Sequence, residues 1–185
     1  MAHKLPISRG KTGIAVGPCE PLRTARPRAT WEARTMELET LLRNEKIPFE
    51  KKTHRTAFTS QELAAAEHVP GRFVAKPVLV KGEKGFAMCV IAACDRLDLD
   101  RAARALGEPR VELATEEEMR IVCPDCEIGA EPPVGRLFNL KTVMDERLAS
   151  DTYLVMQAGT HTEAVKLLRE DWERVCNPIK ARIAV

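Results

Sequence analysis

Three separated segments of the sequence carry residues whose types suit chemistry on an anionic or carbonyl group. In the first, Lys76 lies inside the apolar run from Val74 to Val80. Side chains alternate along a strand with period two, so both same-face neighbours of this lysine, Val74 and Val78, are apolar. A lysine in such surroundings either extends its ammonium group to solvent or serves an anionic group in a pocket. The residues alone leave both interpretations open.

The second segment, Cys123–Gly135, is rich in glycine and proline. Gly129 and Gly135 permit backbone conformations that are closed to other residues, and prolines such as Pro133 stiffen the chain. A rigid loop that presents backbone N–H groups suits an oxyanion or a phosphate. An ordinary turn-rich connection has the same composition and is the structural alternative.

The third segment, residues 158–164, places Gly159, Thr160 and His161 next to one another. A histidine between threonines after a glycine suits a polar pocket, whereas a surface histidine in a turn is the plainer alternative. Each of the three segments therefore admits a structural explanation when it is taken alone.

These segments must be positioned by an alternation of short helices and strands. Periodicity and capping patterns predict helices at 37–44, 59–67, 98–106 and 170–176 and one that begins at Thr115. Short apolar runs bounded by turn residues predict strands at 47–53, 73–81, 85–91, 111–113, 136–143, 153–157 and 163–168, with a loop at 121–134. No repeating βαβ rhythm is present, so the pattern predicts an α+β fold.

The chain divides into a basic N-terminal segment and one folded domain. Residues 1–35 hold seven Lys/Arg and two Asp/Glu, a charge of +5, and lack helical or strand periodicity. We interpret them as a disordered basic tail or a gene-model extension before Met36, with a functional basic arm as the alternative. Residues 36–178 are predicted to form the domain and residues 179–185 a C-terminal tail.

Residues 36–185 hold 22 Lys/Arg and 25 Asp/Glu, a charge of −3. A dedicated duplex-DNA binder concentrates basic residues on its folded part, so DNA is not an expected partner. No stretch approaches the roughly 20 apolar residues that span a bilayer, and the start shows no secretory signal. We therefore expect a cytoplasmic protein without membrane contact.

The cysteines do not indicate a disulfide framework in a chain of this kind. Cys123-x-x-Cys126 has the spacing of half a zinc site or of a redox pair. A structural zinc needs two further ligands, and the sequence has no second Cys-x-x-Cys or His pair. No metal or cofactor is expected.

Taken in order, the segments resemble the YbaK/prolyl-tRNA-synthetase-associated domain family over about 36–178. The likeness comprises Lys76 after an alanine in a strand, Leu-Ala-Thr-Glu-Glu-Glu at 113–118, the Gly-x-x-x-Pro arrangement of Gly129 and Pro133 in the loop, and Ala-Gly-Thr-His-Thr-Glu-Ala at 158–164 followed by Asp-Trp-Glu at 171–173. Pro77 after the lysine and Cys123 before Pro-Asp-Cys depart from the family's pattern, but neither change removes a proposed catalytic group.

The resemblance implies a mixed, curved, barrel-like β-sheet with flanking helices. It also implies trans-editing, the hydrolysis of the ester that joins a small amino acid to the 3′ acceptor end of a mischarged tRNA. An aminoacyl-tRNA synthetase is an optional partner. By the same resemblance Lys76 would hold the terminal phosphate or the α-amino region, and Gly129 would bind the reacting carbonyl through backbone groups. The implied substrate-binding positions are Pro133, Gly135, Gly159, Thr160 and His161.

An aminoacyl ester is already an activated bond, so position, a water molecule and oxyanion stabilisation suffice to hydrolyse it. This fits the lack of a Ser-His-Asp set in the sequence, and a ribose hydroxyl of the substrate would assist the water. The alternative is a non-catalytic tRNA- or synthetase-binding module of the same fold. A nucleic-acid regulator is a third class, which the charge of the folded part disfavours.

Overall fold

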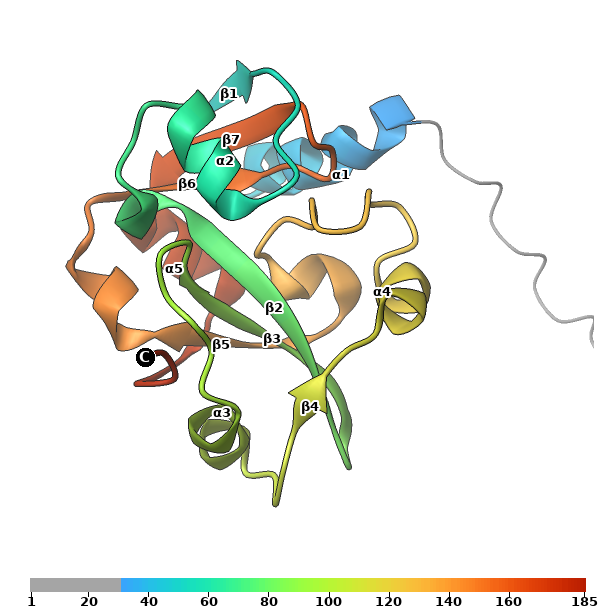
Figure 1. The fold of residues 1–185 in the computed structure, drawn as a ribbon. Coiled ribbons are helices and arrows are strands. Elements are labelled where there is room, and N and C mark those ends of the chain that lie inside the picture. Colours follow the sequence, from blue (N-terminus) through green and yellow to red (C-terminus); the bar gives the residue numbers. More distant parts are fainter. Residues whose placement is uncertain (1–30) are drawn as a thin grey trace, which may run out of the picture.

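The computed structural model describes residues 31–185, with side chains from residue 37 onward. Its α-helices are α1 (Trp31–Asn44), α2 (Ser60–Ala66), α3 (Leu99–Leu106), α4 (Glu116–Val122) and α5 (Arg169–Cys176) (Figure 1). Its strands are β1 (Phe49–Thr53), β2 (Ala75–Gly82), β3 (Gly85–Ala92), β4 (Glu112–Leu113), β5 (Lys141–Asp145), β6 (Tyr153–Gln157), β7 (Glu163–Leu168) and β8 (Ile179–Ala181). Short 3-10 helices are η1 (Gly71–Phe73), η2 (Gly135–Phe138) and η3 (Glu146–Ser150). None of the helices in this part of the chain is long and apolar enough to cross a membrane.

The strands form two sheets. The smaller sheet, in the order β1-β7-β6, is antiparallel, and the larger, in the order β4-β2-β3-β5-β8, combines antiparallel and parallel pairs. The sheets approach each other at a parallel bridge between Val74 and Val155. The predicted α+β class with a mixed sheet and flanking helices is confirmed. The strands do not close into a barrel, because β1 to β8 lie in two sheets.

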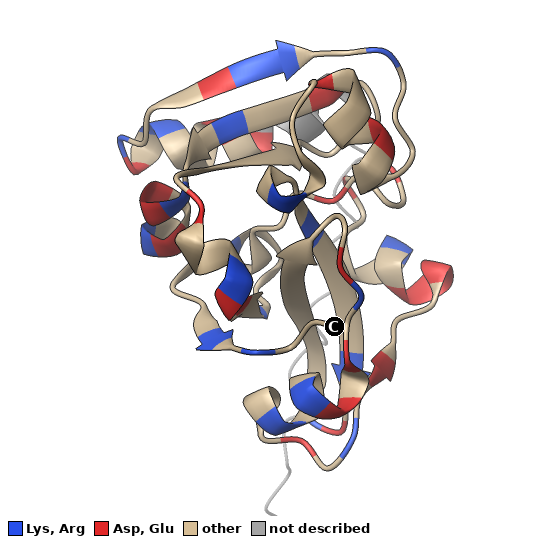
Figure 2. Cartoon of the chain, turned by 60° about the vertical axis from the view of Figure 1, so that its left-hand side comes forward, with Lys and Arg blue, Asp and Glu red and all other residues tan. Residues whose placement is uncertain are grey.

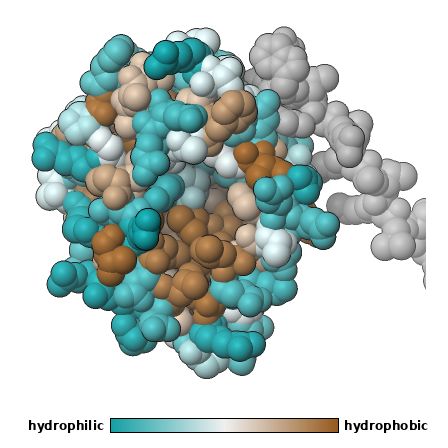
Figure 3. Space-filling view, in the orientation of Figure 1, coloured by the Kyte–Doolittle hydropathy of each residue, from teal (hydrophilic) through white to brown (hydrophobic). Residues whose placement is uncertain are grey.

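The main core lies between the two sheets and the helices α1 and α5. Its fully buried side chains include Leu38, Leu42, Met88, Leu154, Met156 and Trp172. A second cluster packs α3 against the other face of the larger sheet, and a third packs α2 against the smaller sheet. Figure 3 shows an apolar area in the middle of the face on which β2 lies in front. The partly buried Val78, Leu99 and Leu106 pack against the second cluster.

The helices begin and end where short-range hydrogen bonds dictate. Thr59 and Thr115 each form a capping box with the glutamate three residues later. The sequence predicts a helix start at both threonines. Asp98 caps α3 through the Arg101 N–H, and Gly107 ends it with a φ of +67°. These signals fix where α2, α3 and α4 lie, and thereby the loops that follow them.

Three predicted boundaries are wrong. The first helix begins at Trp31 rather than at 37, so the proposed tail at 1–35 overlaps it by five residues; the rest of that tail lies outside the described residues. The strand predicted at 136–143 is divided, because Asn139 adopts a left-handed φ of +56° that ends η2 before β5 begins.

The C-terminal tail predicted at 179–185 is also wrong. Residues Ile179–Ala181 form β8, which pairs in parallel with β5. Ile183 and Ala184 are buried in the second cluster. The segment is therefore part of the domain, whose boundary at 178 has to move to the last described residue.

Charged residues of both signs are distributed over the surface. In Figure 2, blue and red segments alternate along α3, and both colours occur on β1. Many of these charges are paired, as in the ion pair of Lys51 with Glu39 and Glu163 at 2.9 Å each. This mixture agrees with the small negative charge of residues 36–185 and gives no support to a DNA-binding face.

Candidate active site

The predicted loop and the predicted histidine segment are joined directly. The Glu127 N–H donates to the Gly159 carbonyl, and the Gly159 N–H donates to the Ala130 carbonyl, both at 2.9 Å. The Glu127 carboxylate also accepts the His161 N–H at 2.7 Å, across 34 positions of sequence. These three bonds fix the backbone of residues 159–161 against the loop.

Gly129 lies at this junction. Its φ of +86° is a left-handed conformation that residues with a Cβ rarely adopt. A Cβ at this position would lie 3.8 Å from His161 Cε1 and 3.6 Å from the Phe58 carbonyl oxygen. The structure therefore brings together Gly129, Gly159 and His161, three of the residues that the sequence assigns to the site.

Glu131 engages the N–H group of Gly129. Both carboxylate oxygens accept this N–H at 3.1 Å, and the side chain is only 3% exposed. Burial raises the pKa of the Glu131 carboxyl, although hydrogen bonds from its own N–H and from Gly129, and the neighbouring His161, oppose the shift. An N–H held by a carboxylate is not free to stabilise an oxyanion. In the described part of the chain no donor is bonded to the Gly129 carbonyl oxygen, which is the backbone group left for a substrate.

The imidazole of His161 is held by Ala57 and Gln157. Its Nδ1 lies 3.1 Å from the Ala57 carbonyl oxygen, to which Gln157 Nε2 donates at 2.8 Å. Because a carbonyl oxygen only accepts, we assign the proton to Nδ1, which leaves Nε2 as an acceptor. The Phe58 ring, 65% exposed, lies with its centroid 4.9 Å from that of the imidazole. A polar nitrogen is thus presented beside an exposed aromatic ring.

Lys76 approaches this region from β2. Its ammonium donates to the Asp95 carbonyl at 2.6 Å. Burial lowers the pKa of Lys76, and the nearby Asp95 charge opposes the shift. Among residues 31–185 this is the one hydrogen bond of the ammonium group, so two of its three N–H donors remain for a ligand. The ammonium group is therefore only partly exposed and is bonded to a backbone carbonyl, and its role in binding an anion stays a prediction.

The register of the strands relates Lys76 to the histidine side of the site. Val74 bridges Val155, and Lys76 and Gln157 each follow two residues later on parallel segments. Side chains alternate along both segments, so Lys76 and Gln157 emerge on the same side. No hydrogen bond or ion pair among the described residues joins Lys76 to Gly129 or His161. Of the predicted catalytic pair, Lys76 thus lies on β2 and Gly129 in the loop after α4, without a direct contact.

A surface cavity of about 520 Å³ adjoins the acceptor of the Lys76 ammonium. Its lining includes Asp95 together with two arginines, Arg72 and Arg147. Both arginines are partly exposed, with 67% and 47% of their side-chain surface accessible. The cavity thus holds two guanidinium groups, each paired with a carboxylate of the lining: Arg72 with Asp151 at 3.9 Å and Arg147 with Asp95 at 3.3 Å.

The remaining predicted binding residues have structural contacts. Pro133 is buried, and its carbonyl oxygen accepts a hydrogen bond of 2.9 Å from Trp172 Nε1. Gly135 is buried where a Cβ would lie 2.9 Å from the Leu140 carbonyl oxygen. Thr160 is 4% exposed, and its hydroxyl lies 3.5 Å from Glu163. We interpret Pro133 and Gly135 as anchors of the loop in the core.

Sequence reasoning missed Gln157, Phe58, Glu127 and Glu131. A glutamine at the end of the apolar run Tyr-Leu-Val-Met-Gln is a polar residue in a buried strand, which was the available signal for Gln157. The two glutamates lie inside the loop that the sequence singled out. Phe58 is an exposed residue directly before the N-cap of α2, and no sequence pattern distinguishes it.

The cysteine pair of the loop has divided surroundings. Cys123 is buried in the main core, and burial, reinforced by the Glu131 charge, raises its pKa to about 12. Cys126 is only partly buried. Within residues 31–185, no three His, Cys, Asp or Glu side chains gather in a way that could hold a metal ion. A thiol held neutral by burial is an inert packing group.

The fold is similar to that of solved structures, although no similar sequence is found among curated proteins. A crystal structure of a candidate trans-editing enzyme for prolyl tRNA synthetase is 24% identical with a TM-score of 0.72, and the match covers 82% of this chain and 97% of that one. The structure of hypothetical protein APE2540 is 20% identical with a TM-score of 0.74, covering 80% of this chain and 99% of that one. At such identities the two structures establish the fold alone.

The sequence profile of the aminoacyl-tRNA editing domain matches residues 54–175. This range contains the Gly129–His161 junction and Lys76, and it begins just before the carbonyl that holds the imidazole. The chain belongs to the YbaK-type family of aminoacyl-tRNA editing domains.

Proposed function

We propose that this protein is a trans-acting deacylase, which hydrolyses the ester of a mischarged tRNA that carries a small amino acid. The observation that carries the proposal is the half-buried Lys76 ammonium, which has two unused donors and adjoins a cavity with two arginines. The 3′ end of an aminoacyl-tRNA supplies the anionic phosphate that such a group would bind. Membership of the editing-domain family supports the reaction class.

The roles follow from the groups that each residue leaves free. Lys76 would hold the terminal phosphate, or the carbonyl oxygen as it gains negative charge. The Gly129 carbonyl and His161 Nε2 are acceptors on residues far apart in sequence, and a Cβ on Gly129 would lie 3.8 Å from His161 Cε1. The two acceptors would receive the α-amino group or a ribose hydroxyl. Phe58 beside the imidazole would limit the size of the amino-acid side chain.

The water would be activated by the substrate itself. No Ser-His-Asp set is visible in the sequence, and the neighbouring ribose hydroxyl of the tRNA is close to the ester carbon by covalent geometry. Hydrolysis measured on tRNA that ends in 2′-deoxyadenosine tests this step. An unchanged rate would show that the hydroxyl takes no part.

The proposal is tested by deacylation of a panel of Ala-, Ser-, Cys- and Pro-tRNA with wild type and Lys76→Ala. Lys81→Ala is the matched control, because Lys81 lies on the same strand with its side chain exposed and paired with Glu118. Wild type and the control should hydrolyse one ester, and the rate with Lys76→Ala should fall by about 100-fold. Equal rates for wild type and Lys76→Ala would refute the role of the lysine.

A non-catalytic tRNA- or synthetase-binding module is the second candidate. One observation favours it: the Gly129 N–H, the predicted oxyanion donor, is engaged by Glu131. Binding of the same tRNAs, measured by filter retention, separates the two candidates. Retained binding without hydrolysis of any panel member would establish the module and exclude the deacylase.

A further inference from the structure

The carbonyl that receives the catalytic lysine belongs to residues 95–98, a segment without regular secondary structure after β3. This segment is paired with residues 183–185. Arg96 and Val185 exchange two backbone hydrogen bonds, of 3.1 and 2.9 Å. A segment between a strand and a helix is thus held at its middle by residues from the other end of the domain.

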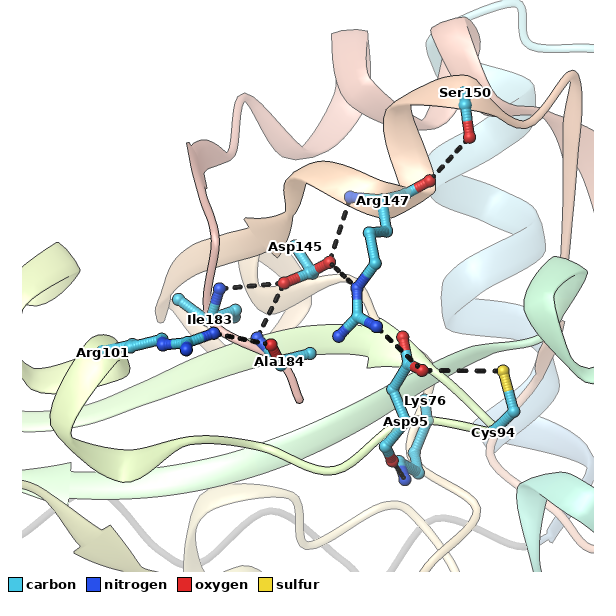
Figure 4. Close-up of polar contacts among 9 residues, drawn as sticks. All are labelled: Lys76, Cys94, Asp95, Arg101, Asp145, Arg147, Ser150, Ile183 and Ala184. Atoms are coloured by element: carbon cyan, nitrogen blue, oxygen red, sulfur yellow. Dashed lines mark hydrogen bonds and ion pairs between the residues drawn. The ribbon is translucent and has the colours of Figure 1, made fainter.

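A buried carboxylate holds the far side of this pairing (Figure 4). Asp145, with no exposed surface, accepts the N–H groups of Ile183 and Ala184 on Oδ2, each at 2.8 Å. Its Oδ1 accepts the Arg147 N–H at 3.0 Å and Arg147 Nε at 3.2 Å. The donors to this carboxylate therefore come from Ile183 and Ala184 on one oxygen and from Arg147 on the other.

Arg147 closes the network. Its Nη1 lies 3.3 Å from Asp95 Oδ1, while the Asp95 carbonyl accepts the Lys76 ammonium. Figure 4 shows these contacts as one continuous chain from Ala184 through Asp145, Arg147 and Asp95. The acceptor of the lysine is consequently fixed twice, through the backbone pairing of its segment and through its own side chain.

We propose that Arg147 and residues 183–185 are positioning groups that hold the Lys76 ammonium for the substrate by fixing the Asp95 carbonyl. That a substrate uses the positioned ammonium rests on the proposed function, whereas the positioning of the ammonium does not. A role confined to stability is the competing explanation, because the same contacts also join β5 and β8 to the rest of the larger sheet.

Two variants loosen the network at different points. Arg147→Met removes the contacts of the guanidinium with Asp95 and Asp145, at a side chain that is 47% exposed and therefore dispensable for packing. Val185→Pro removes the N–H that donates to the Arg96 carbonyl. Val165→Ala, in the buried part of β7, is the control that lowers stability in the other sheet, in a core cluster that contains none of the network residues.

The first measurement is the rate at which sulfo-N-hydroxysuccinimide acetate labels Lys76, followed by peptide mass spectrometry with Lys81 as the internal reference. Losing one net hydrogen bond corresponds to a rise in Lys76 labelling of about 3- to 10-fold in both network variants. Arg147→Lys, which keeps the charge, should return labelling towards the wild-type rate. Val165→Ala should leave it unchanged at a comparable loss of stability.

The second measurement is deacylation by the same variants. A displaced lysine should lower kcat/KM by about 10- to 100-fold, with partial recovery in Arg147→Lys. Unchanged labelling in Arg147→Met and Val185→Pro, or an equal rise in Val165→Ala, overturns the inference. If wild type hydrolyses no ester, the proposed function fails, and the labelling rates still decide whether the network positions the lysine.

Discussion

Replacing Asp145 by asparagine tests the buried end of the network as a source of stability. An amide keeps one oxygen, so its NH₂ group must face either the N–H groups of Ile183 and Ala184 or those of Arg147. In both orientations two hydrogen bonds to a charge are replaced by donors that face donors. At about 1.5–3 kcal/mol for each such bond, the unfolding free energy should fall by about 3–6 kcal/mol at neutral pH.

The same substitution should change the pH dependence of stability. Burial alone would raise the pKa of Asp145, but hydrogen bonds from Arg147, Ile183 and Ala184 lower it overall. A carboxylate whose pKa is lower in the folded state contributes stability above its unfolded pKa of about 3.9, and that stability is lost as the pH falls through the folded pKa. The difference between wild type and variant should therefore shrink in acid.

Urea unfolding followed by far-UV circular dichroism, at neutral pH and at steps below pH 4, measures both effects. Asp171→Asn is the matched control, because its pair with the 63% exposed Arg174 lies at the surface and should contribute about 0–1 kcal/mol. A loss of under about 1 kcal/mol for Asp145→Asn would refute the reasoning. A difference from wild type that stays constant in acid would refute the assignment of the lowered pKa.

Three further substitutions test the site loop. Trp172→Phe should lower the unfolding free energy by about 1–3 kcal/mol, because the buried Pro133 carbonyl loses its partner; an unchanged urea midpoint would contradict this. Glu131→Gln should be stabilised relative to wild type at neutral pH. The folded-state pKa of Glu131 is raised, so wild type loses stability as the pH rises through it, and parallel stability–pH curves for the two proteins would argue against the shift. Gly129→Ala should cost about 1–2 kcal/mol, because its φ is +86°, and a thermal melt that matches wild type would exclude the left-handed conformation.

Elements with local signals could be predicted from the sequence, and those held by distant partners could not. The capping box at Thr59 and the glycine at 107 act within a few residues, so both helix boundaries follow from the letters alone. Residues Ile179–Ala181 are too short to show a strand period, and they become β8 only because β5 is available beside them. The division into two sheets likewise depends on pairing between strands that are distant in sequence.

The site divides in the same way. Gly129 and His161 could be singled out because their neighbours in sequence are unusual, and the structure places them together. The hydrogen bond from the Gly129 N–H to Glu131 could not be predicted, because the sequence does not show whether the glutamate side chain points into the protein or into solvent. Gln157 and the imidazole meet at the carbonyl oxygen of Ala57, 100 positions before the glutamine, so this relation could not be predicted either.

The pairing of residues 95–98 with residues 183–185 has a consequence for the order of folding. The β2–β3 hairpin pairs residues that are close in sequence. The hydrogen bond from Arg101 to the Ala184 carbonyl instead joins residues that are 83 positions apart. Closing a long loop precedes any gain from the contact, so such contacts form late. A folding intermediate would contain the strand that bears Lys76 but not the carbonyl that fixes its ammonium. The Lys76 site would then be completed in the last step of folding. After refolding begins, the rate of Lys76 labelling should fall to its native value only when this step occurs.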